Sequence, residues 1–432
     1  MLRLLRWVLL FFFRQVVRVY FRKVEVQNAP ARSVERRLFG ANHVNGIIDP
    51  MLVMTATWCR IAPLAKAPLW KIPGLNLLLR AAEAVPVVRR QDEPGKGEGS
   101  NEELFRSVAR HLESGANVLI FPEGISRNEL HVVRLKTGAG HMLVGAREQG
   151  VQGLTFQAVG LEFDERETFR SRALVLFGPV RSVDELAAAG GDLVEAITER
   201  LRDDLTELVV EGATWEEREL IARVAELLAH ESGDRTLAGW NSIGRRVEAA
   251  RKALHGEHGP LYNEVHGAVS GYYEGLAAAR LSDEQLVAGQ GDEGAQAMRR
   301  LALLLLLPLA LAGAVLFWLP YQIPKLSTRL AKGETDVVST YKVGLGLVVF
   351  PAWTALLALL TLVLAPSPWG IPGALAVGAL PFAVLPWLDE VDRLQGEGRG
   401  GVEVEPPPEE ELRRRRERAL DAINRARAEI GA

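Results

Sequence analysis

The segment at residues 42–50 holds a histidine and an aspartate six positions apart, His43 and Asp49, directly after a predicted strand at residues 37–41. Asp49 followed by Pro50 is typical of a helix start, because aspartate caps a helix and proline fits its first turn. His43 would then lie in the preceding loop, and Asp49 could cap its helix and still accept the Nδ1–H of the imidazole. That contact would fix the tautomer and leave Nε2 as a general base. The alternative is a helix cap beside an unrelated loop histidine.

Other charged side chains follow the ends of two further predicted strands. Glu123 and Gly124 follow an apolar strand at residues 117–121, and two arginines follow a strand at residues 85–88. The basic residues near these strand ends are Arg89, Arg90, Arg127, Arg134 and Lys136. Strand ends in α/β sheets line ligand crevices, and guanidinium and ammonium groups suit phosphate. The sequence therefore predicts a phosphate site beside the His–Asp pair, although a solvated surface is the better explanation for each arginine taken singly.

Short β-rich runs alternate with helical stretches between residues 37 and 179, which predicts an α/β domain. Strands are expected at residues 37–41, 85–88, 117–121, 155–161 and 173–177, and helices at residues 50–58, 68–82, 101–114, 135–148 and 184–189. From residue 191 to residue 294 apolar residues recur at helical spacing, which predicts a helical subdomain.

Long uncharged apolar runs in the last third of the chain predict membrane-spanning helices. The runs cover residues 301–319, 343–365 and 370–388, and the third is interrupted by Pro372, Pro381 and Pro386. About 20 apolar residues suffice to cross a bilayer core. We therefore expect two or three crossings, with buried core helices as the alternative, and the charges in the loops leave their orientation open.

The first 22 residues combine arginines with Trp, Phe, Leu and Val, and the arginines fall within an arc of roughly 160° on an ideal helix. This pattern predicts a helix in the membrane interface, with its arginines toward anionic head groups. A signal peptide is the alternative, but Arg14 and Arg18 follow the apolar stretch and no small-residue cleavage site appears.

Composition excludes several classes of protein. Hydrophobic residues make up 48% of the 432 and charged residues 24%, which excludes a mainly disordered chain. The net charge of −3 gives no general attraction to nucleic acid. The single cysteine, Cys59, excludes a disulfide scaffold and a cysteine-built metal site. The remaining histidines lack convincing ligand spacing, and the absence of a full Gly-x-Ser-x-Gly motif argues against a serine hydrolase.

Taken together, these segments resemble the glycerol-phosphate and lysophosphatidate acyltransferase family of glycerolipid synthesis. Four blocks appear in the family's order: Asn42-His43 with Asp49, residues 85–89, Phe121-Pro122-Glu123-Gly124, and residues 153–163, where Ala158 replaces the usual proline. Residues 135–138 also match a downstream Lys-x-Gly. The resemblance covers residues 40–179 well and the rest only in layout.

Two departures from the common pattern resemble the fungal-type glycerol-3-phosphate/dihydroxyacetone-phosphate branch of the family. Five residues rather than four separate His43 from Asp49, and the third block continues Ile125-Ser126-Arg127 instead of Thr-Arg-Ser. The resemblance implies a mixed sheet flanked by helices, followed by the helical subdomain and the C-terminal transmembrane helices.

The resemblance also implies direct acyl transfer from a thioester to a glycerol hydroxyl. In this mechanism His43 is the base, Asp49 orients it, Arg89 binds the phosphate with Arg127 or Lys136 assisting, and Glu123 and Gly124 shape the glycerol pocket. It implies no metal and no cofactor, with acyl-CoA or acyl-carrier protein as the donor. The expected partners are membrane lipids and glycerol 3-phosphate or lysophosphatidate, with no nucleic acid.

The expected layout is an interfacial helix at residues 1–24, an acyltransferase domain at 25–182, a helical subdomain at 183–298, a membrane region at 299–390 and a charged tail at 391–432. The expected location is a bacterial inner membrane, with the catalytic domain on the cytoplasmic face. Two alternatives stay open: acylation of a lysophospholipid such as 1-acylglycerol 3-phosphate, and a membrane scaffold or lipid-binding protein with a degenerate site.

Overall fold

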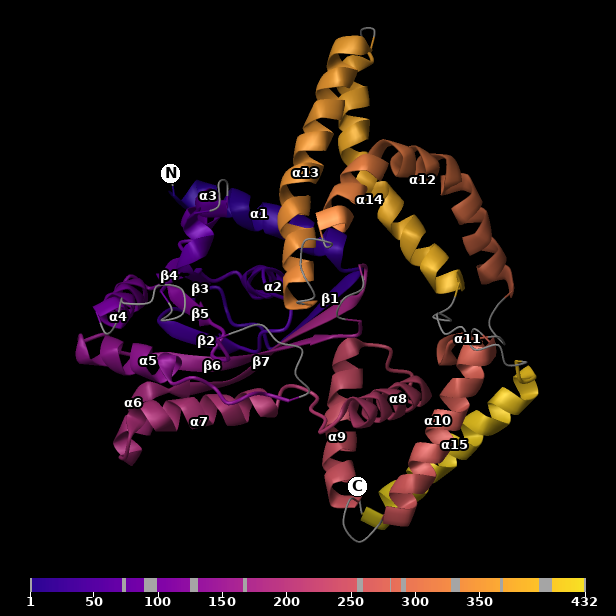
Figure 1. Cartoon of the computed structure of the whole chain (residues 1–432), viewed down its shortest axis with the longest axis horizontal. Coiled ribbons are helices and arrows are strands. Elements are labelled where there is room, and N and C mark those ends of the chain that lie inside the picture. The colour runs from indigo at the N-terminus through magenta and orange to yellow at the C-terminus, as the bar shows by residue number, and fades with distance from the viewer. Residues whose placement is uncertain are drawn as a thin grey trace. The chain divides into compact units, whose positions relative to one another are not determined.

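The computed structural model describes residues 2–71, 75–88, 99–124, 131–165, 169–254, 259–279, 281–288, 293–327, 335–365, 368–395 and 406–430. The chain divides into two compact units, Met1–Glu211 and Gly212–Ala432. The first unit is built on a sheet and the second is helical (Figure 1).

Seven strands form the sheet of the first unit, in the order β1-β7-β6-β2-β5-β3-β4. Strands β2 to β6 run in one direction, whereas β7 is antiparallel to β6 and β1 is parallel to β7. Their bounds are β1 Lys23–Gln27, β2 Arg37–Ala41, β3 Ile61–Lys66, β4 Val85–Val87, β5 Asn117–Ile120, β6 Thr155–Phe163 and β7 Arg172–Ser182. The expected mixed sheet is confirmed, and the sequence prediction missed β1 and β3.

Helices cover both faces of this sheet (Figure 1). One face carries α1 (Leu2–Tyr20), α2 (Ile48–Ala56) and α3 (Leu75–Ala81), with the short 3-10 turn η1 (Ala67–Lys71) before α3. The other face carries α4 (Gly99–Glu113), α5 (Gly138–Glu148), α6 (Val183–Ala189) and α7 (Leu193–Thr206). The central strands are therefore buried on both sides, as a mostly parallel sheet requires.

The sheet-bearing unit extends past residue 182, where the sequence analysis placed the start of the helical subdomain. Ile197, Leu201 and Leu205 of α7 are fully buried in the main hydrophobic core, together with Leu143 of α5 and Phe156 of β6. These apolar residues recur every four positions because they form the face that α7 packs on the sheet. The compact unit accordingly ends at Glu211.

The N-terminal helix α1 packs on its own domain with one face. Leu9, Phe13 and Val17 are buried, and α1 contacts α2 and α3. The arginine stripe differs from the sequence expectation, because two of its members turn toward the protein. Arg6 donates to the carbonyl of Ile61 and pairs with Glu83, and the Arg14 guanidinium lies 3.8 Å from the centre of the Trp58 ring.

The C-terminal end of α1 is fixed by one buried guanidinium. Arg170, in the turn before β7, donates through one nitrogen to the carbonyls of Arg18 (2.6 Å), Val19 (3.2 Å) and Phe21 (3.1 Å). These carbonyls include the last ones of a helix, which have no partner within it. The pairing of β1 with β7 continues this attachment.

Four helices of the second unit share a hydrophobic cluster: α8 (Trp215–Glu231), α10 (Gly259–Ala279), α11 (Asp283–Ala288) and α15 (Glu409–Ile430), while α9 (Leu237–Leu254) packs along α8. The sequence analysis treated residues 391–432 as a charged tail. Instead, α15 buries Leu412, Ala419 and Ile423 in the cluster. Its charged residues occupy the remaining faces of an amphipathic helix.

The second unit also contains the three apolar helices α12 (Glu293–Ser327), α13 (Thr335–Leu364) and α14 (Gly370–Gln395). Two segments of the described chain are long and apolar enough to cross a membrane, Leu301–Ile323 and Gly370–Asp389, and Val348–Leu364 in α13 is a shorter apolar helix. Large side chains along them are exposed, among them Leu305, Val315 and Leu375.

An indole replaces a missing backbone donor between two of these helices. Pro320 has no N–H, so it cannot donate to the carbonyl of Leu316 four residues earlier in α12. Trp353 of α13 donates its Nε1–H to that carbonyl at 2.8 Å. Such cross-helix bonds allow proline in helices surrounded by lipid.

Candidate active site

The residues expected to do chemistry follow two neighbouring parallel strands, β2 and β5. Parallel strands end at the same edge of a sheet, so the loop after β2 and the turn after β5 meet there. The loop carries His43 and the turn carries Phe121–Gly124. Asn42 starts the loop and is buried. Its Nδ2 donates to the carbonyl of Leu161 in β6 at 3.0 Å, and its Oδ1 accepts the backbone N–H of Leu161 at 2.7 Å.

His43 and Asp49 are in contact, as their spacing suggested. Nδ1 of His43 lies 2.9 Å from Oδ2 of Asp49, and the same oxygen accepts the backbone N–H groups of Val44 and Asn45 at 2.7 Å each. The Asp49 side chain is fully buried, whereas the His43 side chain keeps 16% of its surface exposed. Because the buried carboxylate accepts from Nδ1, the other ring nitrogen, Nε2, is left for a substrate.

The expected helix-capping role of Asp49 is wrong. Helix α2 begins at Ile48, its N-cap residue Ile47 makes no side-chain cap bond, and Asp49 already lies within the first turn. The carboxylate turns back to the loop amides instead, so it organises the His43 loop rather than the helix end. Its second oxygen, Oδ1, is buried and has no hydrogen-bond partner in the described part of the chain.

The turn after β5 holds His43 from two further directions. Oε1 of the buried Glu123 accepts the backbone N–H of His43 at 3.1 Å. The ring of Phe121 stacks on the imidazole, with centroids 4.2 Å apart and planes 23° apart. Sequence reasoning placed Glu123 at the site but missed both contacts, because they join residues about 80 positions apart.

Gly124 closes this turn in a conformation that favours glycine. Its φ is +78°, and its N–H donates to the carbonyl of Phe121 at 3.0 Å. A Cβ at this position would lie 2.5 Å from Nζ of Lys136, whose own backbone N–H donates to the carbonyl of Pro122. The exposed Lys136 therefore places its ammonium directly beside the turn.

The two predicted arginine ligands, Arg89 and Arg127, lie outside the described residues. The strand before Arg89, β4, ends at Val87 and runs in the same direction as β2 and β5, so it ends at the same edge of the sheet. Arg134 is described and exposed. Among the described residues, no group of three or more His, Cys, Asp or Glu side chains gathers as metal ligands would.

Comparison with known proteins connects this site to a family. The family model described as Acyltransferase matches residues 23–161, from β1 into β6, and so includes both the His43 loop and the Glu123 turn. Residues 23–161 form an acyltransferase domain. The match ends within β6, so the helices after residue 161 lie beyond it.

Curated relatives agree with the resemblance drawn from the motifs. An uncharacterized acyltransferase of Schizosaccharomyces pombe is 26% identical over 225 residues, covering 50% of this chain and 33% of that protein. Glycerol-3-phosphate O-acyltransferase 1 of Saccharomyces cerevisiae is 23% identical over 297 residues, covering 62% of this chain and 38% of the yeast protein. The chain thus spans little more than a third of the length of these relatives.

Among solved structures, this chain is similar to the 1-acyl-sn-glycerophosphate acyltransferase PlsC of Thermotoga maritima. It is 18% identical, and the match covers 49% of this chain and 80% of that chain with a TM-score of 0.33.

Proposed function

We propose that this protein is a membrane-bound O-acyltransferase that moves an acyl chain from a thioester to the hydroxyl of glycerol 3-phosphate, with dihydroxyacetone phosphate as a second possible acceptor. The observation that carries the proposal is the contact of His43 Nδ1 with the buried Asp49, at the sheet edge of an acyltransferase domain. The similarity to glycerol-3-phosphate O-acyltransferase 1 of Saccharomyces cerevisiae supports the choice of acceptor.

In the proposed reaction, Nε2 of His43 takes the proton of the acceptor hydroxyl as the oxygen attacks the thioester carbonyl. The tetrahedral intermediate then expels the thiolate, which receives the proton from the imidazolium, so no covalent enzyme intermediate forms. The carboxylate of Asp49 balances the positive charge that develops on the ring. Its burial strengthens this interaction, because little water screens it.

The remaining site residues position the base and the acceptor. Glu123 and Phe121 hold the backbone and ring of His43, which restricts the imidazole to one orientation. Lys136, beside Gly124, supplies positive charge for the acceptor phosphate, and Arg89 and Arg127 are proposed to complete that set.

Membrane attachment is part of the proposal, since the acyl donor and the product are lipids or lipid-like. The apolar segments Leu301–Ile323 and Gly370–Asp389 would anchor the chain. Trp7 and Phe11 of α1 are 63% and 54% exposed, so the free face of this helix would contact the bilayer surface.

The test is acyl transfer by the detergent-purified full chain from palmitoyl-CoA. Glycerol 3-phosphate, dihydroxyacetone phosphate and 1-acylglycerol 3-phosphate are offered in parallel, and His43→Ala is the control. Product from glycerol 3-phosphate that is lost in the variant is the expected result. If only the lysophospholipid is acylated, the lysophospholipid is the acceptor instead of glycerol 3-phosphate. If no acceptor is acylated, the assay is repeated with acyl-carrier protein as the donor, and a second negative result would favour a lipid-binding scaffold.

A further inference from the structure

The helical bundle of the second unit contains helices from both sides of the apolar region in the sequence. Helices α8, α10 and α11 precede the three apolar helices α12 to α14, and α15 follows them. Leu412, Ala419 and Ile423 of α15 are buried in one hydrophobic cluster with Val269 and Leu276 of α10. Figure 1 shows α15 lying along α10. The chain therefore returns to this bundle after its three apolar helices.

Helix α15 contacts α10 closely along much of its length. A Cβ on Gly275 of α10 would lie 2.8 Å from Cδ2 of Leu412. Arg415 donates to a backbone carbonyl of α10 at 3.2 Å, and Arg425 pairs with Glu264 of α10. The contacts from Leu412 to Arg425 extend over about three and a half turns of α15. This extent makes α15 a full member of the bundle.

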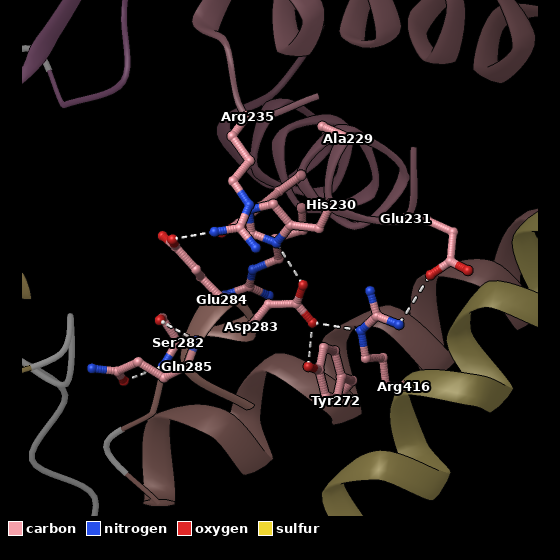
Figure 2. A network of polar contacts seen from close by, with 12 residues as sticks. Ala229, His230, Glu231, Arg235, Tyr272, Ser282, Asp283, Glu284, Gln285 and Arg416 are labelled. Carbon is pink, nitrogen blue, oxygen red and sulfur yellow. Dashed lines mark hydrogen bonds and ion pairs between the residues drawn. The ribbon is translucent and has the colours of Figure 1, made fainter. Parts of the chain in front are cut away.

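A buried carboxylate, that of Asp283 at the start of α11, joins α15 to the earlier helices as well (Figure 2). Tyr272 of α10 donates its hydroxyl to Oδ1 at 2.5 Å, and Arg416 of α15 donates its Nε–H to the same oxygen at 2.8 Å. His230 of α8 places Nδ1 2.6 Å from Oδ2, and Arg416 also pairs with Glu231 of α8 at 3.1 Å. A buried carboxylate is costly unless donors surround it, so Arg416 is part of the folded bundle.

Helix α15 belongs in water rather than in a bilayer. Its 22 residues include seven arginines and six acidic residues. Among them, Arg414 and Arg418 are exposed. Charged side chains inside a bilayer are costly. The bundle, including α15, therefore lies on one side of a membrane that α12 to α14 enter.

The first part and the last part of the apolar region lie side by side. Trp387 of α14 donates its Nε1–H to the carbonyl of Leu303 in α12 at 3.1 Å. Further along α12, a Cβ on Gly313 would meet Cγ2 of Val384 and lie 3.6 Å from Cγ of Leu380. The partner residue moves backward along α14 as α12 moves forward, so these two stretches run in opposite directions. The start of α12 and the end of α14 are therefore neighbours.

Charged residues flank the apolar segments at these neighbouring ends. Arg299 and Arg300 directly precede the apolar segment of α12, and Asp389 and Glu390 end that of α14. Tryptophan is favoured at the boundary between lipid and water, which suits the position of Trp387 just before these acidic residues. Both ends are therefore expected to reach the same surface of the bilayer.

The connections to the bundle are too short or too polar to cross a bilayer by themselves. Residues 289–292 join α11 to α12, and residues 396–408 join α14 to α15. Four residues extend about 14 Å at most, against an apolar core of about 30 Å. The second connection is longer, but its sequence from Glu397 to Glu405 carries four charged residues, which are costly inside a bilayer. Crossings are therefore made by the apolar helices alone.

We propose that the apolar region begins and ends on the same face of the bilayer, with α14 as the returning span. Two of the three apolar helices then cross, rather than all three, because three crossings would leave α15 on the face opposite to α10. The proposal rests on the membrane attachment in the proposed function and is independent of the acyl-transfer reaction.

The test is labelling of single cysteines in the full chain with a membrane-impermeant maleimide, in spheroplasts of a bacterial expression host before and after permeabilisation. Cys59, the one cysteine of the chain, is buried and is replaced by alanine. The reporters are Ala249→Cys on α9, before the apolar region, Ala428→Cys on α15, after it, and Trp369→Cys directly before α14, all at exposed positions. Labelling of each variant after denaturation gives the reference value.

The reagent should reach Ala249→Cys and Ala428→Cys from the same face, and Trp369→Cys from the opposite face. An epitope tag after Ala432 is a second reporter that replaces no residue, and antibody should reach it from the same face as Ala249→Cys. If Ala249→Cys and Ala428→Cys are labelled from opposite faces, or if all three reporters are labelled from one face, the proposal is wrong.

Extraction of the membranes with alkaline carbonate distinguishes a failure of this proposal from a failure of the proposed function. The chain should stay in the membrane fraction. Release of the chain would refute membrane attachment itself, and this proposal with it. A retained chain whose reporters on α9 and α15 lie on opposite faces would refute the proposed crossings alone.

Discussion

Replacing Asp49 by asparagine should remove most of the activity while leaving the acyltransferase domain folded. The substitution keeps an acceptor for the N–H groups of Val44 and Asn45 but removes the charge that faces Nδ1 of His43. Opposite charges about 4 Å apart attract by about 4 kcal/mol at an effective dielectric constant of about 20. Since about 1.4 kcal/mol is a factor of ten in rate, we expect kcat to fall by roughly 10²- to 10³-fold.

The same substitution has a smaller cost in stability. Hydrogen bonds to a charged acceptor contribute about 1 kcal/mol more than those to a neutral one, and Asp49 accepts three, so about 3 kcal/mol is the expected upper limit. A matched control is Asp204→Asn, which removes another buried carboxylate of the same unit, paired with Arg181 at 2.6 and 2.9 Å and lying outside the site. It should lower stability without a comparable loss of kcat.

The assay compares kcat for the wild type, Asp49→Asn, His43→Ala and the double variant, with thermal unfolding of each. If Asp49 acts through His43, the double variant should be no slower than His43→Ala alone, because residues that act as a unit are not additive. Activity of Asp49→Asn within fivefold of the wild type, or a double variant that loses the product of both single effects, would refute this account of the pair.

Three further predictions concern the rest of the first unit. Arg89→Ala should raise the KM for the acceptor more than it lowers kcat, since phosphate binding is shared by the ground and transition states; an unchanged KM would contradict the role. Gly124→Ala should raise the acceptor KM, because the added Cβ would displace Nζ of Lys136, and should lower stability by about 1–3 kcal/mol because of the positive φ. The control is Gly150→Ala, where φ is +89° but an added Cβ would meet no atom within 4 Å. This control should lower stability and leave the acceptor KM unchanged. Arg170→Gln should speed amide hydrogen exchange in α1 by roughly 30-fold, equivalent to about 2 kcal/mol. The control is Arg172→Gln, whose partner Asp164 lies near the surface, and it should leave exchange in α1 unchanged. Equal exchange rates of α1 in the two variants would exclude the proposed attachment.

Local signals in the sequence were sufficient for the pairing of His43 with Asp49, because the two lie in one short loop. The contacts of Glu123 and Phe121 with His43 form because β2 and β5 are neighbours in the sheet, and no local sequence pattern predicts which strands become neighbours. Strand β3 was missed because Pro63 lies within it, and proline normally argues against an interior strand.

Helical periodicity also left the partner of each helix undetermined. The apolar spacing of α7 suits a bundle as well as a sheet, and the arginine arc of α1 could not show that Arg6 contacts Ile61 and Glu83. In contrast, α15 carried a usable signal: Leu412, Ala419 and Ile423 stand seven and four positions apart within a highly charged segment. That spacing places them on one face of a helix.

The pairing of β1 with β7 has a consequence for synthesis on the ribosome. Residues 23–27 find their partner strand only when residues 172–182 have emerged, and Arg170 reaches the end of α1 at the same stage. At about 5–20 residues per second, this delay is about 7–30 s. During that interval the apolar helix at the N-terminus is attached to the nascent domain by neither of these contacts. The helix is therefore available to other surfaces before the sheet is complete, and a bilayer would be one of them if the protein is the proposed membrane-bound enzyme.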